Sequence, residues 1–297
     1  MARSRTALQE AERKRRRTER LKFFKKLFFR NTLVSVGTIL VTVVVLASLL
    51  GPLFSNVDPL KLHWRQRNLP PSSAHIFGTD TYGRDQLVVV MYGGRNSLSI
   101  AAIVTVLTVS FATIIGVVAP WFRSLDNILM RAMDVMMSIP SMILAIALVG
   151  FLGASRTNVI IAIVLTQTPR FARVVRSAVL SVREQVYIEA AQGLGASNLR
   201  IMFRHILPNC FGPIMVQATF LFAHAILVES SLSYIGVGTP PPIPSWGNLM
   251  SEGRKYITSG WWLTVIPGIA LSMSILGLNI MGDGLRDTLD PRLRGLN

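Results

Sequence analysis

Long stretches without a charged residue constrain this sequence more than any other feature. Six intervals lack Lys, Arg, Asp and Glu over 21 to 27 residues. The one at 230–251 holds Gly236, Gly238 and four prolines, so we expect the end of a span followed by a loop there. The other five lie at positions 31–57, 96–122, 135–155, 205–228 and 256–282. An α-helix needs about 20 apolar residues to cross the hydrocarbon core of a bilayer, so each interval is long enough to do so. Charged residues make up only 15% of the chain, against about 25% in soluble proteins. The sequence therefore predicts an all-α membrane protein.

A sixth, shorter apolar segment reads TNVIIAIVLTQTP and covers residues 157–169. Thirteen helical residues rise roughly 20 Å, which is less than the core thickness of about 30 Å. The segment can span only if Arg170 and Arg173 extend their charged ends to the interface. With it we predict six transmembrane helices, at about 32–54, 97–120, 136–153, 158–178, 211–235 and 261–282.

The distribution of basic residues orients these spans. The first 30 residues hold 12 Lys and Arg, and the chain carries a formal charge of +16. With six spans and the N-terminus inside, 23 basic residues lie on the inner side and 8 on the outer side, which agrees with the positive-inside rule. We therefore expect cytoplasmic termini, a basic cytoplasmic tail at 1–30 and a transmembrane domain at 31–297. The tail is either an amphipathic helix on anionic lipid or a solvated segment that only fixes orientation.

Motifs for catalysis are missing from the sequence. It holds no G-x-x-x-x-G-K-[ST], no H-E-x-x-H and no G-x-S-x-G motif. Its four histidines lie far apart and Cys210 is its single cysteine, so we expect no metal site and no disulfide within the chain. A non-catalytic conduit, a transporter subunit or a scaffold fits these features better than an enzyme.

Residues 186–209, VYIEAAQGLGASNLRIMFRHILPN, form an expected inner loop with a distinct pattern. Helix-forming residues lead to Gly193 and Gly195, which permit a tight turn. Helical character then resumes at Asn198, and Pro208 is expected to end it. The pattern predicts two short helices joined by a glycine turn on the cytoplasmic face. The small side chains at the turn would let another protein approach closely.

The same residues resemble the EAA loop of binding-protein-dependent ABC importers, whose pattern is EAA-x3-G-x9-I-x-L-P. His205 stands at the isoleucine position, and the other positions match at Glu189, Ala190, Ala191, Gly195, Leu207 and Pro208. Further stretches are similar to the C-type permeases of dipeptide, oligopeptide and nickel importers, at residues 77–98, 134–145, 244–254 and 267–295. The resemblance covers roughly residues 30–297.

This resemblance implies a type I (MetI-like) ABC importer permease fold in a bacterial cytoplasmic (inner) membrane. It implies a second homologous permease, one or two P-loop ATPase subunits docked through the EAA loop, and an extracytoplasmic substrate-binding protein. ATP and Mg would bind to the ATPases, and this chain would hold no cofactor. The expected substrates are di- and oligopeptides, with nickel or glutathione as the alternative within the family.

A few polar residues are further candidates for function. Glu229 is the only carboxylate well inside an expected span, so it is paired, faces a translocation path, or lies near the outer interface. Arg170, Arg173 and Arg176 share a helix face, which favours lipid contact, with a salt-bridged face toward a partner as the alternative. The expected outer segments carry candidates for contact with the binding protein or partner permease, or for internal loop bonding: Asp80, Arg84, Asp85 and Trp246.

Two other classes of protein compete with this interpretation. A self-contained secondary transporter or channel would favour intramembrane charges or related halves, and it would leave the EAA pattern unexplained. A membrane-anchored nucleic-acid binder would use the basic tail, but the tail has no zinc motif and no RNP-like sequence. The expected partners therefore include membrane lipid and no nucleic acid.

Overall fold

The computed structural model describes residues 32–54 and 61–289, and these fold into helices with connecting turns. The expected basic tail at 1–30 lies outside the described residues. The helices that build the bundle are α2 (Thr32–Phe54), α3 (Gln86–Val118), α4 (Arg123–Ser138), α5 (Ser141–Leu152), α6 (Arg156–Arg183), α9 (Leu207–Ile235) and α11 (Trp262–Leu289). Shorter helices are α7 (Val186–Gly193), α8 (Asn198–Ile201) and α10 (Trp246–Gly253).

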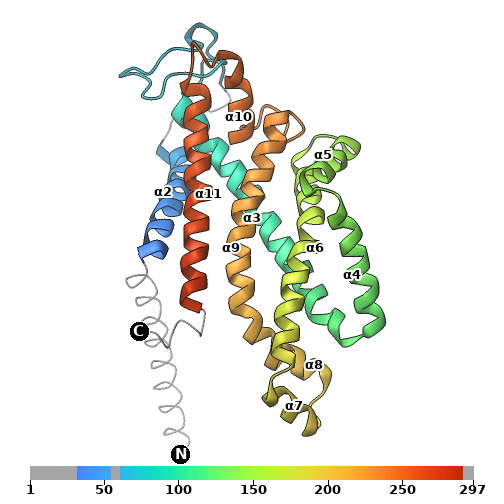
Figure 1. Cartoon of the computed structure of the whole chain (residues 1–297). Coiled ribbons are helices and arrows are strands. Elements are labelled where there is room, and N and C mark those ends of the chain that lie inside the picture. The colour runs from blue at the N-terminus through green and yellow to red at the C-terminus, as the bar shows by residue number, and fades with distance from the viewer. Residues whose placement is uncertain (1–31, 55–60, 290–297) are drawn as a thin grey trace, which may run out of the picture.

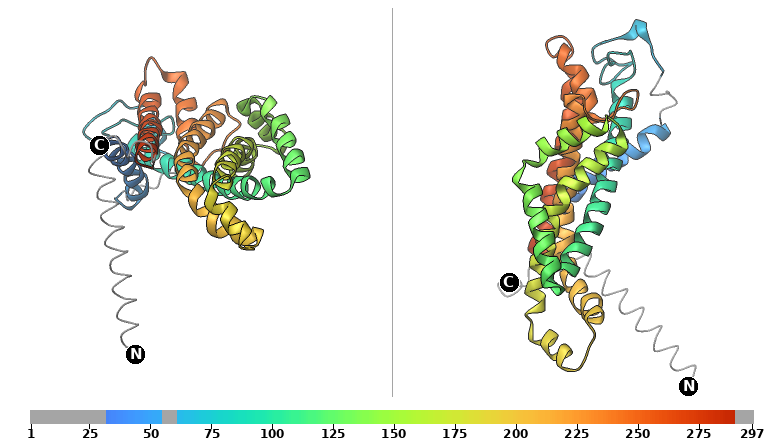
Figure 2. Two further views of the ribbon diagram at one scale, coloured as in Figure 1. Left: turned by 60° about the horizontal axis from the view of Figure 1, so that its bottom comes forward. Right: turned by 90° about the vertical axis from the view of Figure 1, so that its right-hand side faces the viewer.

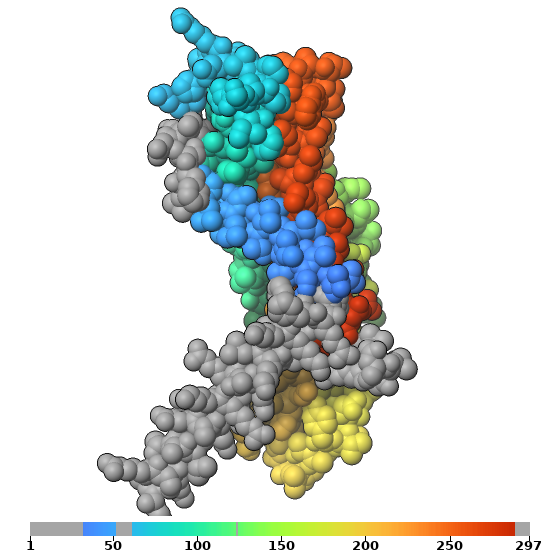
Figure 3. Space-filling view, turned by 90° about the vertical axis from the view of Figure 1, so that its left-hand side faces the viewer, coloured from blue at the N-terminus to red at the C-terminus, as the bar shows by residue number. Residues whose placement is uncertain are grey.

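The molecule is an elongated bundle with different structures at its two ends. In Figure 1, α11, α9 and α6 run side by side along the long axis, and α3 crosses obliquely among them. Residues 61–85 and α10 cover one end, and α7 and α8 project from the other (Figures 1 and 2). Figure 3 shows α2 lying on the outside of the bundle, against α11 and α3. The start of α2 and the end of α11 both point toward the end that carries α7.

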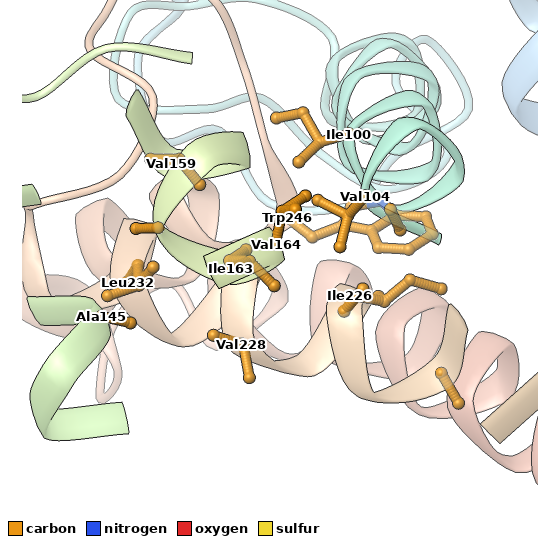
Figure 4. Packing of buried hydrophobic residues seen from close by; sticks show 14 of the residues in the cluster. Ile100, Val104, Ala145, Val159, Ile163, Val164, Ile226, Val228, Leu232 and Trp246 are labelled. Carbon is orange, nitrogen blue, oxygen red and sulfur yellow. The ribbon is translucent and has the colours of Figure 1, made fainter. Parts of the chain in front are cut away.

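Apolar side chains from distant parts of the chain form two cores. The first joins α3, α6, α9 and α10 through fully buried side chains such as Ile100, Ile163, Ile226 and Trp246 (Figure 4). The second lies toward α7 and joins α6 to the segment before α9. Helices that are apolar on several faces cannot be stable in water, and many large apolar side chains on the outside of this bundle are exposed.

The expected number of six membrane-crossing helices is not confirmed. Within the described residues, four helices are long and apolar enough to cross a membrane, at Thr32–Gly51, Gln86–Trp121, Asn198–Ile235 and Trp262–Thr288. A fifth span results if the bent pair α4 and α5 counts as one. The expected fourth span lies in α6, which is a long helix of 28 residues. It does not meet the same criterion, because polar residues from Gln167 onward lower its hydropathy.

The expected span at 136–153 is divided in the structure. Helix α4 ends at Ser138, α5 begins at Ser141, and the two axes differ by 89°. The break falls at Ile139 and Pro140, and Ile139 has an extended backbone with φ −95° and ψ 131°. A residue that precedes proline avoids helical geometry, because the proline ring clashes with it. The sequence Ser-Ile-Pro-Ser therefore ends one helix and starts another.

Helix α3 begins at Gln86, before the expected start of its span at residue 97. Asp85 provides the N-cap, since its carboxylate accepts bonds from the backbone N–H groups of Leu87 and Val88. The helix continues through Arg95, whose side chain is exposed. The helix therefore starts before the expected span, because an exposed arginine near a helix end does not stop the helix.

Candidate functional site

The segment that matches the EAA pattern forms the tip of the molecule at the α7 end (Figure 1). Helix α7 ends at Gly193 and the chain reverses at Gly195, whose φ is +80°. The N–H of Gly195 donates to the carbonyl of Gln192 and the N–H of Ala196 to that of Ala191. This pair of bonds is a Schellman motif, which favours glycine at the left-handed position. The predicted helix–glycine turn–helix is therefore present.

Three isoleucines attach this coupling segment, residues 186–209, to the bundle. Ile188, Ile201 and Ile206 are fully buried and belong to the core cluster that includes Phe171 and Val175 of α6. Burying one such side chain contributes roughly 1.5–3 kcal/mol. The segment thus packs against α6 and continues directly into α9.

The outer surface of the coupling segment is unusually apolar. Leu194 is 89% exposed, Val186 79%, Leu199 67% and Phe203 61%. Glu189 and Ala190 are exposed beside them, and Ala191 is half-buried. A cluster of exposed large apolar side chains next to small residues is typical of a protein interaction surface.

The prediction that Pro208 ends the helix is wrong, because the helix continues through it. Residues 202–206 form a π-helical turn, in which the N–H of Leu207 bonds to the carbonyl of Met202, and α9 continues directly to Ile235. Pro208 lies in the first turn of α9, where proline is tolerated because its missing N–H has no required partner. The second half of the EAA pattern is therefore the rigid start of a long helix.

The outer candidates Asp80 and Arg84 form a buried ion pair. The Nε of Arg84 lies 2.5 Å from Oδ2 of Asp80, and both side chains are less than a tenth exposed. The other carboxylate oxygen of Asp80 accepts bonds from the backbone N–H groups of Tyr82 and Arg84, each at 2.8 Å. Asp85 caps α3 and its Oδ2 lies 2.9 Å from Nδ1 of His75. These charges thus hold residues 61–85 in a fixed conformation.

Glu252 of α10 faces the same ion pair. Burial raises the pKa of its carboxyl above the ordinary range of a glutamate, and the nearby Arg84 guanidinium offsets part of this effect. The charge of Glu252 in turn raises the pKa of the Tyr82 phenol. Both residues line a small hollow of about 190 Å³ together with the proline-rich turn at 241–244.

Glu229 and Trp246 lie together where α9, α10 and α3 meet. Glu229 is fully buried, and the Ser233 hydroxyl donates to its Oε1 at 2.9 Å. The Ser230 hydroxyl lies 3.3 Å from Oε2, and the hydroxyls of Ser97 and Ser245 are further partners of the same carboxyl. The indole Nε1 of Trp246 donates to the carbonyl of Val90. The carboxyl of Glu229 is thus surrounded by serines, with no basic group bonded to it in the described chain.

A set of polar residues that the sequence analysis did not connect lines a hollow of about 270 Å³ between α6, α9 and α11. Its polar members are Gln167 and Arg170 of α6, Gln217 and His224 of α9, and Asn279 of α11. Their spacing could have indicated a shared helix face, since Gln167 and Arg170 are three residues apart and Gln217 and His224 are seven residues apart. The described residues contain no group of three or more metal-ligating side chains.

A bundle with several membrane-crossing helices and a projecting, partly apolar coupling segment defines the chain as the membrane subunit of a transporter. Residues 109–295 match the family of the binding-protein-dependent transport system inner membrane component. Residues 23–71 match the N-terminal TM domain of oligopeptide transport permease C. The chain therefore belongs to the family of inner-membrane components of binding-protein-dependent transport systems.

Relatives with assigned names are similar over most of their length. A peptide transport system permease protein of Brucella suis is 48% identical over 259 residues, which cover 87% of this chain and 88% of the relative. The dipeptide transport system permease DppC of Alkalihalophilus pseudofirmus is 40% identical, over 91% and 89% of the two chains. The di/tripeptide permease DppC of Pseudomonas aeruginosa is 36% identical, over 92% and 93%.

A solved structure supports the fold. The MetNI methionine ABC transporter in an inward-facing conformation contains a chain that is 18% identical, with a TM-score of 0.54. The match covers 68% of this chain and 97% of that chain. The predicted type I importer permease fold is therefore confirmed at the level of the helical architecture.

Family membership confirms that the chain is the multi-pass inner-membrane subunit of a bacterial importer, and a permease rather than an enzyme. A binding-protein-dependent ABC system implies a substrate-binding protein and an ATPase as partners. It also favours the importer over the self-contained carrier and the nucleic-acid binder.

Proposed function

We propose that the chain is one of two related permeases in an ABC importer for di- and oligopeptides. The named relatives support this substrate class, because all three are peptide permeases. Nickel or glutathione import is the alternative within the same family. One or two kinds of P-loop ATPase would carry ATP and Mg, and an extracytoplasmic binding protein would deliver the substrate.

The observation that carries this proposal is the shape of the coupling segment. Its buried isoleucines fix it to α6 and α9, and its exposed apolar side chains face away from the bundle. We infer that Leu194, Leu199 and Phe203 enter a groove on the ATPase, with Glu189, Ala190, Ala191 and Gly195 at the contact. Closure of the ATPases on ATP would then move the rigid helix that begins at Leu207 and Pro208.

We propose that α6 is a further span and that the two chain ends face the cytoplasm. In support, α6 packs against both α3 and α9 and runs along the length of the bundle (Figure 1). The first described residue of α2 and the end of α11 lie toward the coupling segment. The strongly basic N-terminal tail agrees with a cytoplasmic position.

The opposite end would then meet the binding protein and the partner permease. The ion pair of Asp80 and Arg84, together with Asp85 and Trp246, holds this end in shape. The contact itself would come from exposed neighbours on the same segment, such as Trp64 and Ile76.

Affinity purification of the tagged chain in mild detergent tests the function. Wild type should retain a second permease and a P-loop ATPase, and Gly195→Asp should lose the ATPase alone. Gly195 has a positive φ, so the substitution strains the turn. Space around it is open, so the added carboxylate does not crowd the core. Gly153→Asp is the matched control, because Gly153 also has a positive φ and open space and lies at the opposite end.

The outcomes separate the hypotheses. Loss of the ATPase in Gly195→Asp but not in Gly153→Asp supports docking through the coupling segment. A wild-type chain that purifies alone, or only with copies of itself, would refute the importer proposal and favour a self-contained carrier. Identification of the co-purified binding protein would separate peptide from nickel or glutathione import.

A further inference from the structure

The hollow between α6, α9 and α11 is polar although these helices belong to a membrane bundle, and it opens to the surface of the chain, where Arg170 is exposed. In Figure 1, α9 passes between α6 and α11, and side chains of all three helices line the same volume of about 270 Å³. Arg170 lies 14 residues from Arg156 and 13 from Arg183, the two ends of α6. At 1.5 Å per residue it is about 20 Å from either end of the helix.

The polar side chains of the hollow have no partners in the described part of the chain. Gln167, Arg170, Gln217, His224 and Asn279 form no side-chain hydrogen bond or ion pair there, and Nε2 of His224 is buried without a partner. Elsewhere on α6 the arginines are paired: Arg173 bonds to Asp134, and Arg176 forms two bonds with Asp126, at 2.7 and 2.5 Å.

An unpaired guanidinium at this depth is costly unless water or a polar ligand solvates it. Five polar side chains that all face one volume cannot be explained by packing, because apolar residues would fill the volume at lower cost. The hollow is therefore suited to hold water and a polar solute.

The chemistry of the lining selects the solute. Arginine forms paired, charge-assisted hydrogen bonds with a carboxylate. The three carboxamides offer both donors and acceptors, which match peptide groups. No Asp or Glu lines the hollow, so no negative charge there would attract an ammonium group. The best match is a solute with a carboxylate and neighbouring amide groups.

We propose that this hollow is the subunit's wall of the translocation path, and that Arg170 and His224 bind the C-terminal carboxylate of a peptide in transit. The inference rests on the proposed importer function and adds a recognition step within the membrane. Gln167, Gln217 and Asn279 would contact the peptide groups that follow the carboxylate.

Charge-selective labelling in membrane vesicles tests the proposal without requiring knowledge of the preferred peptide. Cys210 is fully buried, and Cys210→Ser gives a cysteine-free background. Leu227, which lines the hollow and is 45% exposed, is replaced by Cys. An anionic and a cationic methanethiosulfonate are compared, with and without ATP.

The anionic reagent should react faster than the cationic one when corrected for reactivity with free thiol. Arg170→Gln should lower this rate ratio about tenfold, because it removes a charge close to the thiol in a partly dehydrated site. Arg170→Lys should keep the ratio. Arg173→Gln, one turn along α6 and outside the hollow, is the matched control and should leave it unchanged.

Two results would overturn the proposal: no labelling of Leu227→Cys in any state, or the same ratio with and without Arg170. The first would mean that the hollow is not aqueous. The second would mean that Arg170 does not make it selective for anions.

Transport by the purified complex in proteoliposomes tests the carboxylate assignment separately. Uptake of dialanine is divided by uptake of dialanine amide, and this ratio is compared between wild type and Arg170→Gln. Any preference of the binding protein for one of the two peptides is the same for wild type and variant, so it cancels when their ratios are compared. We expect the preference for the free acid to fall about tenfold and to persist in Arg173→Gln.

ATP-driven dialanine uptake with an unchanged preference would refute the carboxylate site and leave the importer function standing. Failure to assemble with an ATPase would instead refute the proposed function. Where a complex assembles but takes up neither probe, the labelling ratio still decides the proposal.

Discussion

Glu229 and Arg170 illustrate two ways to place a charged residue within a membrane bundle. Glu229 is enclosed, and serine hydroxyls from three parts of the chain satisfy its oxygens. Arg170 is open to a polar hollow and has no bonded partner in the described chain. A satisfied, enclosed group stabilises the packing of its neighbours, whereas an unsatisfied group next to a cavity indicates a ligand or water.

This contrast predicts a structural role for Glu229. Glu229→Ala leaves several serine hydroxyls without their acceptor and should cost about 1–3 kcal/mol of stability, measured as a lower Tm in detergent. Glu229→Gln keeps an acceptor oxygen and a similar volume, so its loss should be smaller. Glu184→Ala, at an exposed position after α6, is the control.

A Glu229→Gln or Glu229→Ala variant that unfolds like wild type but no longer imports would contradict this role. It would instead support the earlier hypothesis that Glu229 lines the translocation path.

The buried carboxyl of Glu252 should make the stability of the protein depend on pH. Burial raises the pKa of Glu252 in the folded state, so the folded state binds the proton more tightly than the unfolded state does. The contribution of Glu252 to stability is therefore fully present below about pH 4.5 and is lost as the pH rises through the folded value. Relative to Glu252→Gln, wild type should lose thermal stability between pH 4.5 and 7.5. An equal Tm difference at both pH values would contradict the burial of this carboxyl.

At the scale of single residues, the sequence predicted which positions are unusual but not what they contact. The EAA letters located the coupling segment, and Glu229 was recognised as a carboxylate inside a span. Its partners Ser97 and Ser245 come from distant parts of the chain, so no local pattern could indicate them. The polar hollow could not be predicted from single helices, because its lining comes from α6, α9 and α11 together.

At the scale of helices, the contact between α2 and α11 depends on a close backbone approach. A Cβ at Gly37 would lie 2.6 Å from the carbonyl oxygen of Gly277 and 2.6 Å from the backbone nitrogen of Met281. Small residues at such crossings let membrane helices associate by van der Waals packing.

Gly37→Ala should therefore separate α2 from α11 and lower stability by about 1–3 kcal/mol, measured by thermal unfolding of the purified chain in detergent. Gly268→Ala is the matched control on α11, because its Cβ would find only ordinary contact, at 3.7 Å from Met250. A Gly37→Ala variant as stable as Gly268→Ala would show that α2 is not held by this crossing.

Most of the long helices were indicated by charge-free intervals, but the ends of the helices were not. Helix α3 extends past Arg95, and Pro140 divides α4 from α5. The role of Pro208 was wrong because the sequence does not reveal a π-helical turn. Helix boundaries depend on capping groups and on tertiary packing, which override local propensity.

At the scale of the whole molecule, the two ends of the bundle differ in chemistry. One end is held rigid by the buried ion pair of Asp80 and Arg84, and the other presents exposed apolar side chains on the coupling segment. The polar hollow lies between them along α6, α9 and α11. This arrangement suits a subunit that receives substrate at one end and mechanical work at the other.

The family and the helical class could be predicted from sequence because both depend on composition and a short motif. The number of spans could not be settled in the same way, since α6 is long enough to cross a membrane but carries polar residues along its second half. Those residues are partly explained by the ion pairs with α4 and by the hollow.

The central claim is that the coupling segment is where an ATPase docks. Site-specific photocrosslinking in intact cells tests it most directly, with a benzophenone amino acid at Leu194, which is 89% exposed. The control carries the same group at Phe151, which is 88% exposed and lies in α5 near the opposite end (Figure 1). The account predicts a crosslink to a P-loop ATPase from Leu194 and none from Phe151. An ATPase captured at Phe151, or no ATPase captured at Leu194, would contradict it.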